Sequence, residues 1–242
     1  MPQDDSYIGL IVDLGMSEGN DTDFYLKKGF KVIGVEADGT MADHLRRRFT
    51  LAIASGQLQL LNFAASSSFG NVVQFFRHEQ HQGLSGLEKH HHLEAGYTAH
   101  TVMTIDWNTI VAQAGVPYYL KIDIEGQEAA FLSGMLIRKE RPTFISIECH
   151  SLVPVEVLFE LGYRRFKLVD QNPPEGFRLP DPQVEGCPVT SQNWTHSSGP
   201  FGRELPPGKW LSLKQFNTTY ASVQDQRSRT WFDCHAWMPS AA

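Results

Sequence analysis

The sequence predicts an α/β fold with a mostly parallel sheet, helices on both faces and an additional C-terminal extension. Apolar runs alternate with helical patterns from the start of the chain to about residue 170. The runs are continuous and rich in β-branched residues, which is typical of strands that are buried on both faces of a sheet. Strands that alternate with helices indicate repeated strand-helix-strand units, and such units pair their strands in parallel.

The first half of the chain supplies most of the expected strands. The apolar run of residues 7–14 is closed by Gly15, and Gly29 follows a helical pattern at the position where glycine commonly ends a helix. A serine-rich turn ending in Gly70 separates two further runs. We therefore expect strands at residues 7–14, 31–35, 57–63, 72–76 and 98–105, with helices at residues 20–28 and 39–54.

The second half continues the alternation. Asp106 is a natural N-cap, because its side chain can accept hydrogen bonds from the first turn of the helix that follows. One of the apolar runs is interrupted only by Lys121. The pattern predicts strands at residues 118–122, 143–148 and 164–169, and helices that begin at residue 106 and span residues 127–139 and 155–161.

The composition changes after Asp170. Residues 171–208 contain most of the chain's 13 prolines, and a loop of this length in a compact domain is either functional or poorly ordered. The end of the chain is rich in aromatic side chains, which bury much surface when they pack. We therefore expect a core at residues 1–170 and an extension at residues 171–242 that packs on the core and covers the functional site as a lid.

The composition also excludes several classes of protein. With 41% apolar and 20% charged residues the chain is expected to fold, and no apolar run approaches the ~18 residues of a membrane span. A net charge of -6 argues against a protein that binds nucleic acid through its phosphates. The acidic N-terminus is unlike a secretion signal and the three cysteines lie far apart, so we expect a reduced, cytoplasmic protein with no membrane partner. The sequence leaves open whether it forms a homo-oligomer.

A glycine turn follows the first predicted strand. The strand ends in Asp13, and Gly15 and Gly19 allow a ligand to approach the backbone at the carboxyl edge of the sheet, where open α/β sheets bind ligands. Ser17 stands where the dinucleotide fingerprint requires its middle glycine, so pyrophosphate binding is disfavoured. A carboxylate at this turn suits a cationic amino group instead, although an ordinary strand-turn-helix junction also contains such residues.

Three further carboxylates follow strands at the same predicted edge. Glu36 ends the second strand roughly 20 residues beyond the glycine turn, from where a carboxylate can accept both hydroxyls of a ribose. Asp123 and Glu125 follow the strand of Lys121, and two carboxylates so close together require a cation, a hydrogen-bond donor or water nearby. Such pairs mark functional sites more often than structural ones.

Several stretches resemble the FkbM family of S-adenosylmethionine (SAM)-dependent methyltransferases. Residues 12–22 are similar to the family's V-D-x-G-x-x-x-G-x-x-T loop, and residues 121–128 resemble its K-x-D-x-E-G-x-E motif, which is the more specific of the two. Residues 36–39 resemble the acidic end of its second strand, with Gly39 where a proline is usual. Residues 62–65, 83–87 and 102–106 resemble further segments, so the likeness spans about residues 8–150. It implies a Rossmann-like class I methyltransferase fold.

The resemblance also implies how SAM binds. Asp13 would lie near the amino group of SAM, Gly15 under its methionine backbone and Glu36 at its ribose. Asn62 and Ala64, at the end of the third strand, would border the adenine. The full set of expected cofactor-binding residues is Asp13, Gly15, Glu18, Gly19, Glu36, Asn62, Ala64 and Asp123.

A hydroxyl acceptor needs a base to take its proton. His150 follows the strand after that of Asp123 and is the favoured base, while His235 in the aromatic tail is a rival. Asp123 and Glu125 would orient the acceptor, or bind Mg²⁺ or Mn²⁺, which lowers the pKa of a hydroxyl. Six histidines between residues 78 and 100 could bind a metal, but a solvated loop is the simpler interpretation. The expected catalytic residues are therefore His150, Asp123, Glu125 and His235, and the expected metal ligands are Asp123 and Glu125.

The predicted function is SAM-dependent O-methylation of a small-molecule hydroxyl, on a sugar or natural product, as the resemblance implies. A nucleotide-dependent oxidoreductase is the alternative, and the residue at position 17 counts against it. A third hypothesis is a protein that binds SAM or a metal without catalysis. The Asp123 and Glu125 pair counts against that one, because a simple binding protein has little need of both.

Overall fold

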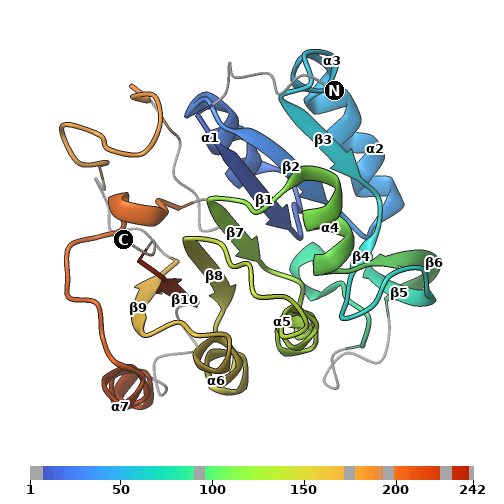
Figure 1. Ribbon diagram of the computed structural model, residues 1–242. Coiled ribbons are helices and arrows are strands. Elements are labelled where there is room, and N and C mark those ends of the chain that lie inside the picture. Colours follow the sequence, from blue (N-terminus) through green and yellow to red (C-terminus); the bar gives the residue numbers. More distant parts are fainter. Residues whose placement is uncertain are drawn as a thin grey trace.

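A seven-stranded sheet forms the centre of the molecule (Figure 1). The computed structural model describes residues 8–89, 96–171, 178–190, 192, 199–223 and 231–239. The strands follow the order β3-β2-β1-β7-β8-β10-β9, and all neighbours are parallel except β10, which is antiparallel to both of its partners. The strands are β1 (Leu10–Leu14), β2 (Lys31–Val35), β3 (Leu58–Leu61), β7 (Tyr119–Ile122), β8 (Phe144–Glu148), β9 (Arg165–Asp170) and β10 (Phe232–Trp237).

Helices cover both faces of this sheet, which confirms the predicted α/β fold. Successive side chains of a strand point to opposite faces. On β7, Leu120 and Ile122 join one apolar cluster and Tyr119 joins the other. The first face packs against α4 (Trp107–Ala114), α5 (Glu128–Met135), α6 (Val153–Glu160) and α7 (Leu213–Val223), and the second against α1 (Asn20–Lys27), α2 (Gly39–Arg48) and α3 (Thr50–Ala54).

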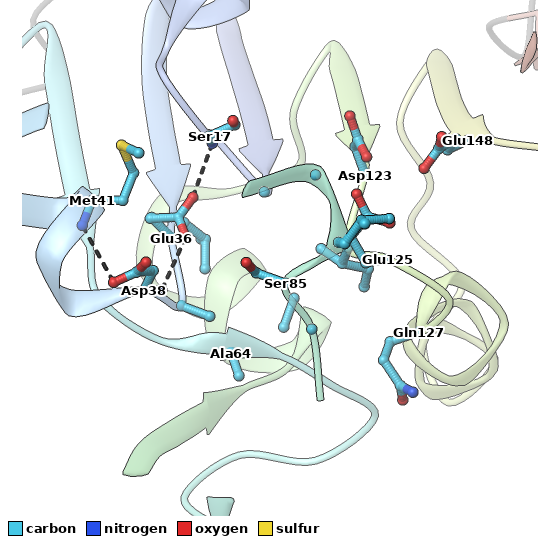
Figure 2. A pocket seen from close by; sticks show the side chains of 18 of the residues that line it. Ser17, Glu36, Asp38, Met41, Ala64, Ser85, Asp123, Glu125, Gln127 and Glu148 are labelled. Carbon is cyan, nitrogen blue, oxygen red and sulfur yellow. Dashed lines mark hydrogen bonds between the residues drawn. The ribbon is translucent and has the colours of Figure 1, made fainter. Parts of the chain in front are cut away.

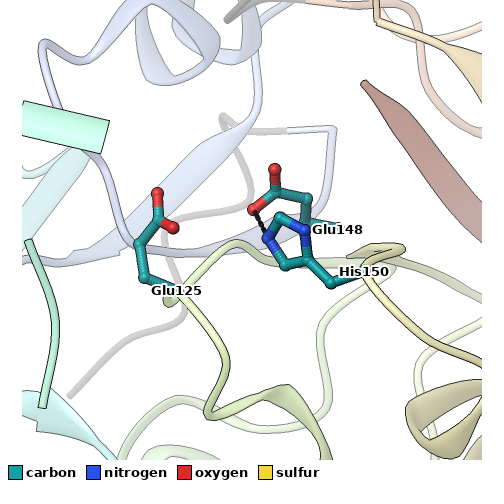
Figure 3. A group of neighbouring side chains, drawn as sticks. All are labelled: Glu125, Glu148 and His150. Atoms are coloured by element: carbon teal, nitrogen blue, oxygen red, sulfur yellow. Dashed lines mark ion pairs between the residues drawn. The ribbon is translucent and has the colours of Figure 1, made fainter. Parts of the chain in front are cut away.

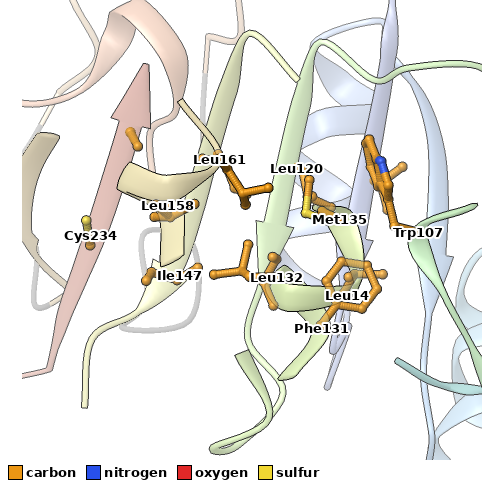
Figure 4. Close-up of a cluster of buried hydrophobic side chains, with 14 of the residues drawn as sticks. Leu14, Trp107, Leu120, Phe131, Leu132, Met135, Ile147, Leu158, Leu161 and Cys234 are labelled. Atoms are coloured by element: carbon orange, nitrogen blue, oxygen red, sulfur yellow. The ribbon is translucent and has the colours of Figure 1, made fainter. Parts of the chain in front are cut away.

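The larger apolar cluster holds the central strands against α4, α5 and α6 (Figure 4). Leu132 and Trp107 are buried in it together with strand residues such as Leu120. Truncation of one such leucine to alanine typically costs about 2–5 kcal/mol of stability. This well-packed core therefore supports the edge of the sheet that carries the polar loops.

A second, smaller sheet lies beside the first and adds a wall to the site. It contains β4 (Ala64–Ala65), β6 (Tyr97–Ile105) and β5 (Val72–His78), in the order β4-β6-β5, with β4 parallel and β5 antiparallel to β6. The loop after β5 includes the short helix η1 (Gln82–Leu84), and the backbones of Phe76 and Gly86 exchange two hydrogen bonds across it. The loop is thereby folded back along β5, and its Gly86 lies against Glu125 of the loop after β7.

Two of the expected helices differ from the structure. The helix expected at residues 39–54 is two helices, because Phe49 leaves the helical conformation with φ −106° and ψ 26°. Its ring is buried and lies against Gly19, so tertiary packing accounts for a break that has no local glycine or proline signal. The helix expected at residues 127–139 ends at Met135, and Ile137 beyond it is exposed.

The chain beyond residue 170 contributes to the core itself. β10 is inserted between β8 and β9, with Asp233 opposite Glu148 and His235 opposite Ser146. The segment before it contains η2 (Gly202–Glu204) and is anchored by a buried ion pair of 2.6 Å between Glu204 and Lys28. A boundary at residue 170 therefore divides the central sheet, because the expected extension supplies one of its inner strands. None of the helices in the described ranges has the length and apolarity needed to cross a membrane.

Candidate functional site

A cavity of about 690 Å³ opens at the carboxyl edge of β1, β2, β7 and β8 (Figure 2). Its lining comes from the loops that follow these strands, from the small sheet and from the loop after β5. Of the described residues in the lining, eight are acidic and one is a lysine or arginine. The acidic residues are Glu18, Asp21, Glu36, Asp38, Asp123, Glu125, Glu148 and Asp233, and the basic one is Lys121.

The glycine turn after β1 is packed closely against the loop after β7. Gly15 has φ +81°, and a Cβ atom there would lie 1.7 Å from the backbone oxygen of Asp123. Only glycine fits this position, since any side chain would clash with the backbone and a positive φ is also unfavourable for it. Ser17 follows with φ 49°, an uncommon conformation for a residue other than glycine. The turn directs the backbone N–H of Ser17 towards Glu36.

Glu36 follows β2 and is held in place by backbone donors. Ser17 N–H donates to Oε2 and Asp38 N–H donates to Oε1, both at 2.9 Å (Figure 2). The side chain is buried, and burial raises its pKa to about 7 in spite of these hydrogen bonds. Asn62 donates to the backbone oxygens of Glu36 and Ala37, so it shapes this loop but does not line the cavity.

The wall next to Glu36 is apolar. It is formed by Ala64 of β4 together with Phe63, Phe75 and Leu87. Ser85 lies between this wall and the carboxylates of the β7 loop (Figure 2). An apolar wall beside a carboxylate that can accept hydrogen bonds suits a flat ring attached to a sugar.

Lys121 lies at the centre of the site among three aspartates. Its Nζ atom is 3.0 Å from Oδ2 of Asp123, 3.3 Å from Asp21 and 3.9 Å from Asp13. Burial alone would lower the pKa of this lysine, but the combined attraction of the three carboxylates raises it well above its usual value. Burial also raises the pKa of Asp21 to about 7 and raises that of Asp13. The ammonium of Lys121 is thus held among three carboxyl groups, two of which burial makes harder to ionise.

The opposite end of the cavity contains two glutamates and a histidine. Glu125 has φ 52° in the loop after β7, while Glu148 ends β8 and His150 follows it. Burial, and then repulsion by Glu148, raises the pKa of Glu125 to about 10. The carboxylate of Glu148 lies 2.9 Å from Nε2 of His150 and raises the pKa of that imidazole.

β10 brings a further acid to this end. Asp233 is level with Glu148 at the carboxyl edge and lines the cavity, and burial raises its pKa well above its usual value. His235, the rival base, lies two residues further along β10 and is buried against Tyr119 with parallel rings. Burial lowers its pKa to about 3. It does not line the cavity, because the antiparallel direction of β10 places it deeper in the sheet than Asp233.

The structure brings most of the expected site residues to one cavity. Gly15, Glu18, Glu36, Ala64, Asp123, Glu125 and His150 line it. Four do not. Asp13 lies beneath the lining and accepts a hydrogen bond from Thr22, and Gly19 packs against the ring of Phe49. Asn62 and His235 occupy the positions given above.

Several lining residues were not among the sequence-predicted site residues. Lys121 interrupts a buried strand, and that interruption is a local signal for a paired charge. Asp21 lies within the expected first helix and gives no such signal. Glu148 ends its strand at the same edge as Asp123 and could have been found from that position alone. Asp233 depends on the insertion of β10, which no local pattern indicates.

The histidines between residues 78 and 100 do not form one group in the described part of the chain. His78 is buried, and its Nδ1 atom accepts hydrogen bonds from the backbones of Gln80 and His81. His81 lines the cavity, whereas His100 is exposed on β6. His90, His91 and His92 lie outside the described residues.

Part of the chain matches a known family of proteins. The model of the methyltransferase FkbM domain matches residues 13–167. A probable ribosomal RNA small subunit methyltransferase A from Methanospirillum hungatei is 42% identical over 52 residues, which are 22% of this chain and 20% of that protein. The match therefore spans only a fifth of that relative's length.

Two solved methyltransferase structures are also similar to this chain. The FkbM methyltransferase from Methylobacillus flagellatus has a TM-score of 0.45 at 19% identity and covers 66% of this chain and 39% of its own. The glycopeptide N-methyltransferase MtfA, solved with S-adenosylhomocysteine, has a TM-score of 0.37 at 11% identity and covers 96% and 83%. The strand order is that of the expected Rossmann-like class I fold. Because the family model covers well over half of the chain, this protein belongs to the FkbM methyltransferase domain family.

Proposed function

We propose that this protein is a SAM-dependent O-methyltransferase that acts on a hydroxyl of a small molecule, a sugar or a natural product. The observation that carries the proposal is the division of one cavity into two ends of different chemistry. Glu36 and an apolar wall form one end, and Glu125, Glu148 and His150 form the other. The strand order places the Lys121 cluster between them, since β1 and β7 separate β2 from β8.

The Glu36 end suits the nucleoside of SAM. The carboxylate can accept hydrogen bonds from both ribose hydroxyls while its existing donors hold it in position. The adenine would lie against the wall that contains Ala64. Asp21 and Asp123, which line the cavity beside Lys121, then face the methionine part, where ionised carboxylates attract the amino group and the sulfonium of SAM. Lys121 in turn supplies a cation for the methionine carboxylate.

Methyl transfer at the opposite end needs little covalent chemistry from the protein. The acceptor oxygen attacks the methyl carbon, the bond between carbon and sulfur breaks, and the sulfur keeps the electron pair. The main task is to hold the oxygen, the methyl carbon and the sulfur in line. The hydroxyl proton must also leave, either to the imidazole of His150 or after a bound cation has lowered the pKa of the hydroxyl.

The charge of the lining supports a small acceptor over a nucleic acid. Among the described residues of the lining, eight are acidic and one is a lysine or arginine, so a polyphosphate would meet repulsion from those acids that are ionised. The same repulsion opposes a dinucleotide pyrophosphate, and Ser17 fills the position of the glycine that such a cofactor requires. A volume of about 690 Å³ falls within the usual range of small-molecule sites, roughly 300–1,000 Å³.

A binding comparison tests the cofactor assignment. We expect SAM and S-adenosylhomocysteine to raise the melting temperature of the full chain, and NAD to leave it unchanged. A ligand at 100 times its Kd stabilises the folded state by about 2.7 kcal/mol, which a thermal shift detects easily. Stabilisation by NAD but not by SAM would refute the proposal in favour of the oxidoreductase.

A further inference from the structure

Three side chains lie close together at the acceptor end of the cavity (Figure 3). One ligand atom from each of Glu125, Glu148 and His150 lies within 4.8 Å of the other two. They come from the loop after β7 and from the end of β8, so parallel neighbouring strands fix their separation. Two carboxylate oxygens and one imidazole nitrogen at this spacing can ligate a single metal ion.

Asp123 does not belong to this group, although the sequence indicated it as a metal ligand. Its Oδ2 atom is 3.0 Å from Nζ of Lys121 and accepts a hydrogen bond from it. An oxygen that is already paired with a buried ammonium is a poor ligand for a cation. Glu148 replaces Asp123 beside Glu125, because β8 ends at the same edge of the sheet.

The group contains two carboxyl groups and a single imidazole. The Oε2 atom of Glu148 is buried and accepts no well-aligned hydrogen bond among the described residues, although Nε2 of His150 lies 2.9 Å away. Asp233 adds a third carboxylate at the same edge. The lysine of the lining is engaged by three aspartates. A cation between these groups would favour their ionised forms, which burial and mutual repulsion otherwise oppose.

We propose that Glu125, Glu148 and His150 bind one divalent cation, Mg²⁺ or Mn²⁺, and that the acceptor hydroxyl completes its coordination. The inference rests on the proposed methyl transfer. Carboxylate and imidazole ligands suit Mn²⁺, and carboxylates with remaining open positions suit Mg²⁺. Three protein ligands leave positions for substrate oxygens, which include the reacting hydroxyl or a neighbouring one.

The cation changes the part that His150 plays in the reaction. Coordination lowers the pKa of the hydroxyl, so its proton can pass to solvent, and the resulting oxygen anion attacks the methyl carbon. The carbon-sulfur bond of SAM breaks and the electron pair stays on sulfur. His150 then acts as a ligand and not as the base, and a sugar or catechol-like diol is the favoured acceptor because two adjacent oxygens can chelate the ion.

Metal binding can be measured without any acceptor. The full chain is titrated with Mn²⁺, and the free ion is followed by electron paramagnetic resonance. We expect one saturable site in the wild-type protein and a loss of affinity of at least about tenfold in Glu125→Gln and Glu148→Gln, since even residues that only support metal ligands contribute that much. Glu160→Gln changes an exposed glutamate of α6 and should bind Mn²⁺ like the wild type.

Two results would overturn the proposal. One is the absence of saturable Mn²⁺ binding up to about 1 mM, which is the weak end of affinities for divalent-cation sites. The other is unchanged affinity in both glutamine variants. SAM binding is measured by calorimetry on the same samples. Loss of metal binding with SAM binding intact removes only the metal site, whereas absent SAM binding removes the proposed function.

Discussion

Replacement of Glu36 by glutamine removes one negative charge from the cofactor end of the cavity. The two oxygens of Glu36 accept backbone N–H groups from Ser17 and Asp38 at 2.9 Å. Glutamine supplies only one such oxygen, so one buried N–H loses its acceptor and the ribose loses a charged partner. A hydrogen bond to a charged group contributes about 1.5–3 kcal/mol. We expect SAM affinity to fall by about 2–3 kcal/mol, or roughly 30- to 150-fold.

Calorimetry with SAM at pH 8 measures this loss, because Glu36 is ionised above its pKa of about 7. Binding of a cationic cofactor beside Glu36 favours the ionised form, so SAM affinity of the wild type should rise as the pH increases from 6 to 8. The rise should be weaker in Glu36→Gln, which has no proton to lose. Glu160→Gln is the matched control. Unchanged affinity in Glu36→Gln would refute the assignment of the ribose to this residue.

Three further predictions concern stability. In the native protein Glu36 and Asp21 keep their protons up to about pH 7, whereas the unfolded chain releases them near the lower, ordinary pKa of a carboxyl group. The melting temperature of the unliganded protein should therefore fall as the pH rises from about 5 to about 7. A rise of the melting temperature over this range would contradict the burial of these two acids. At pH 8, above the pKa of Asp21 of about 7, Lys121→Met removes the cation from three carboxyl groups and should cost about 3–5 kcal/mol in urea denaturation, whereas a loss below about 1 kcal/mol would contradict the pairing. Truncation after Asp170 removes β10 from between β8 and β9, so circular dichroism should show no cooperative unfolding, and a truncated chain that melts cooperatively would show that β10 is dispensable.

The main sheet was largely predictable because its parallel strands are local apolar runs. Each run is buried on both faces, so its pattern survives without knowledge of its neighbours. The same argument predicted the edge where Glu36 and Asp123 meet, since parallel strands end on one side of a sheet. The paired role of Lys121 was not predicted, although a charge within a buried strand is a local signal for a paired side chain.

The insertion of β10 was not predictable from local pattern. More than 60 residues separate β9 from β10 in the chain, and its place between β8 and β9 depends on long-range pairing. For that reason the sequence did not indicate that His235, the rival base, is buried in the sheet. The register of β10 against its neighbours places Asp233 at the cavity and His235 inside the sheet. The break at Phe49 is similar, because its buried ring packs against Gly19, which is distant in the sequence.

The central claim is methyl transfer from SAM to a small-molecule hydroxyl in this cavity. Incubation of the full chain with methyl-labelled SAM and a set of sugars and hydroxylated natural products, in the presence of Mg²⁺, measures it directly. We predict label in an O-methyl group of at least one acceptor, formation of S-adenosylhomocysteine in equal amount, and strongly reduced transfer in Glu36→Gln. Label found only on nitrogen or carbon acceptors, or transfer that Glu36→Gln leaves unchanged, would contradict the account.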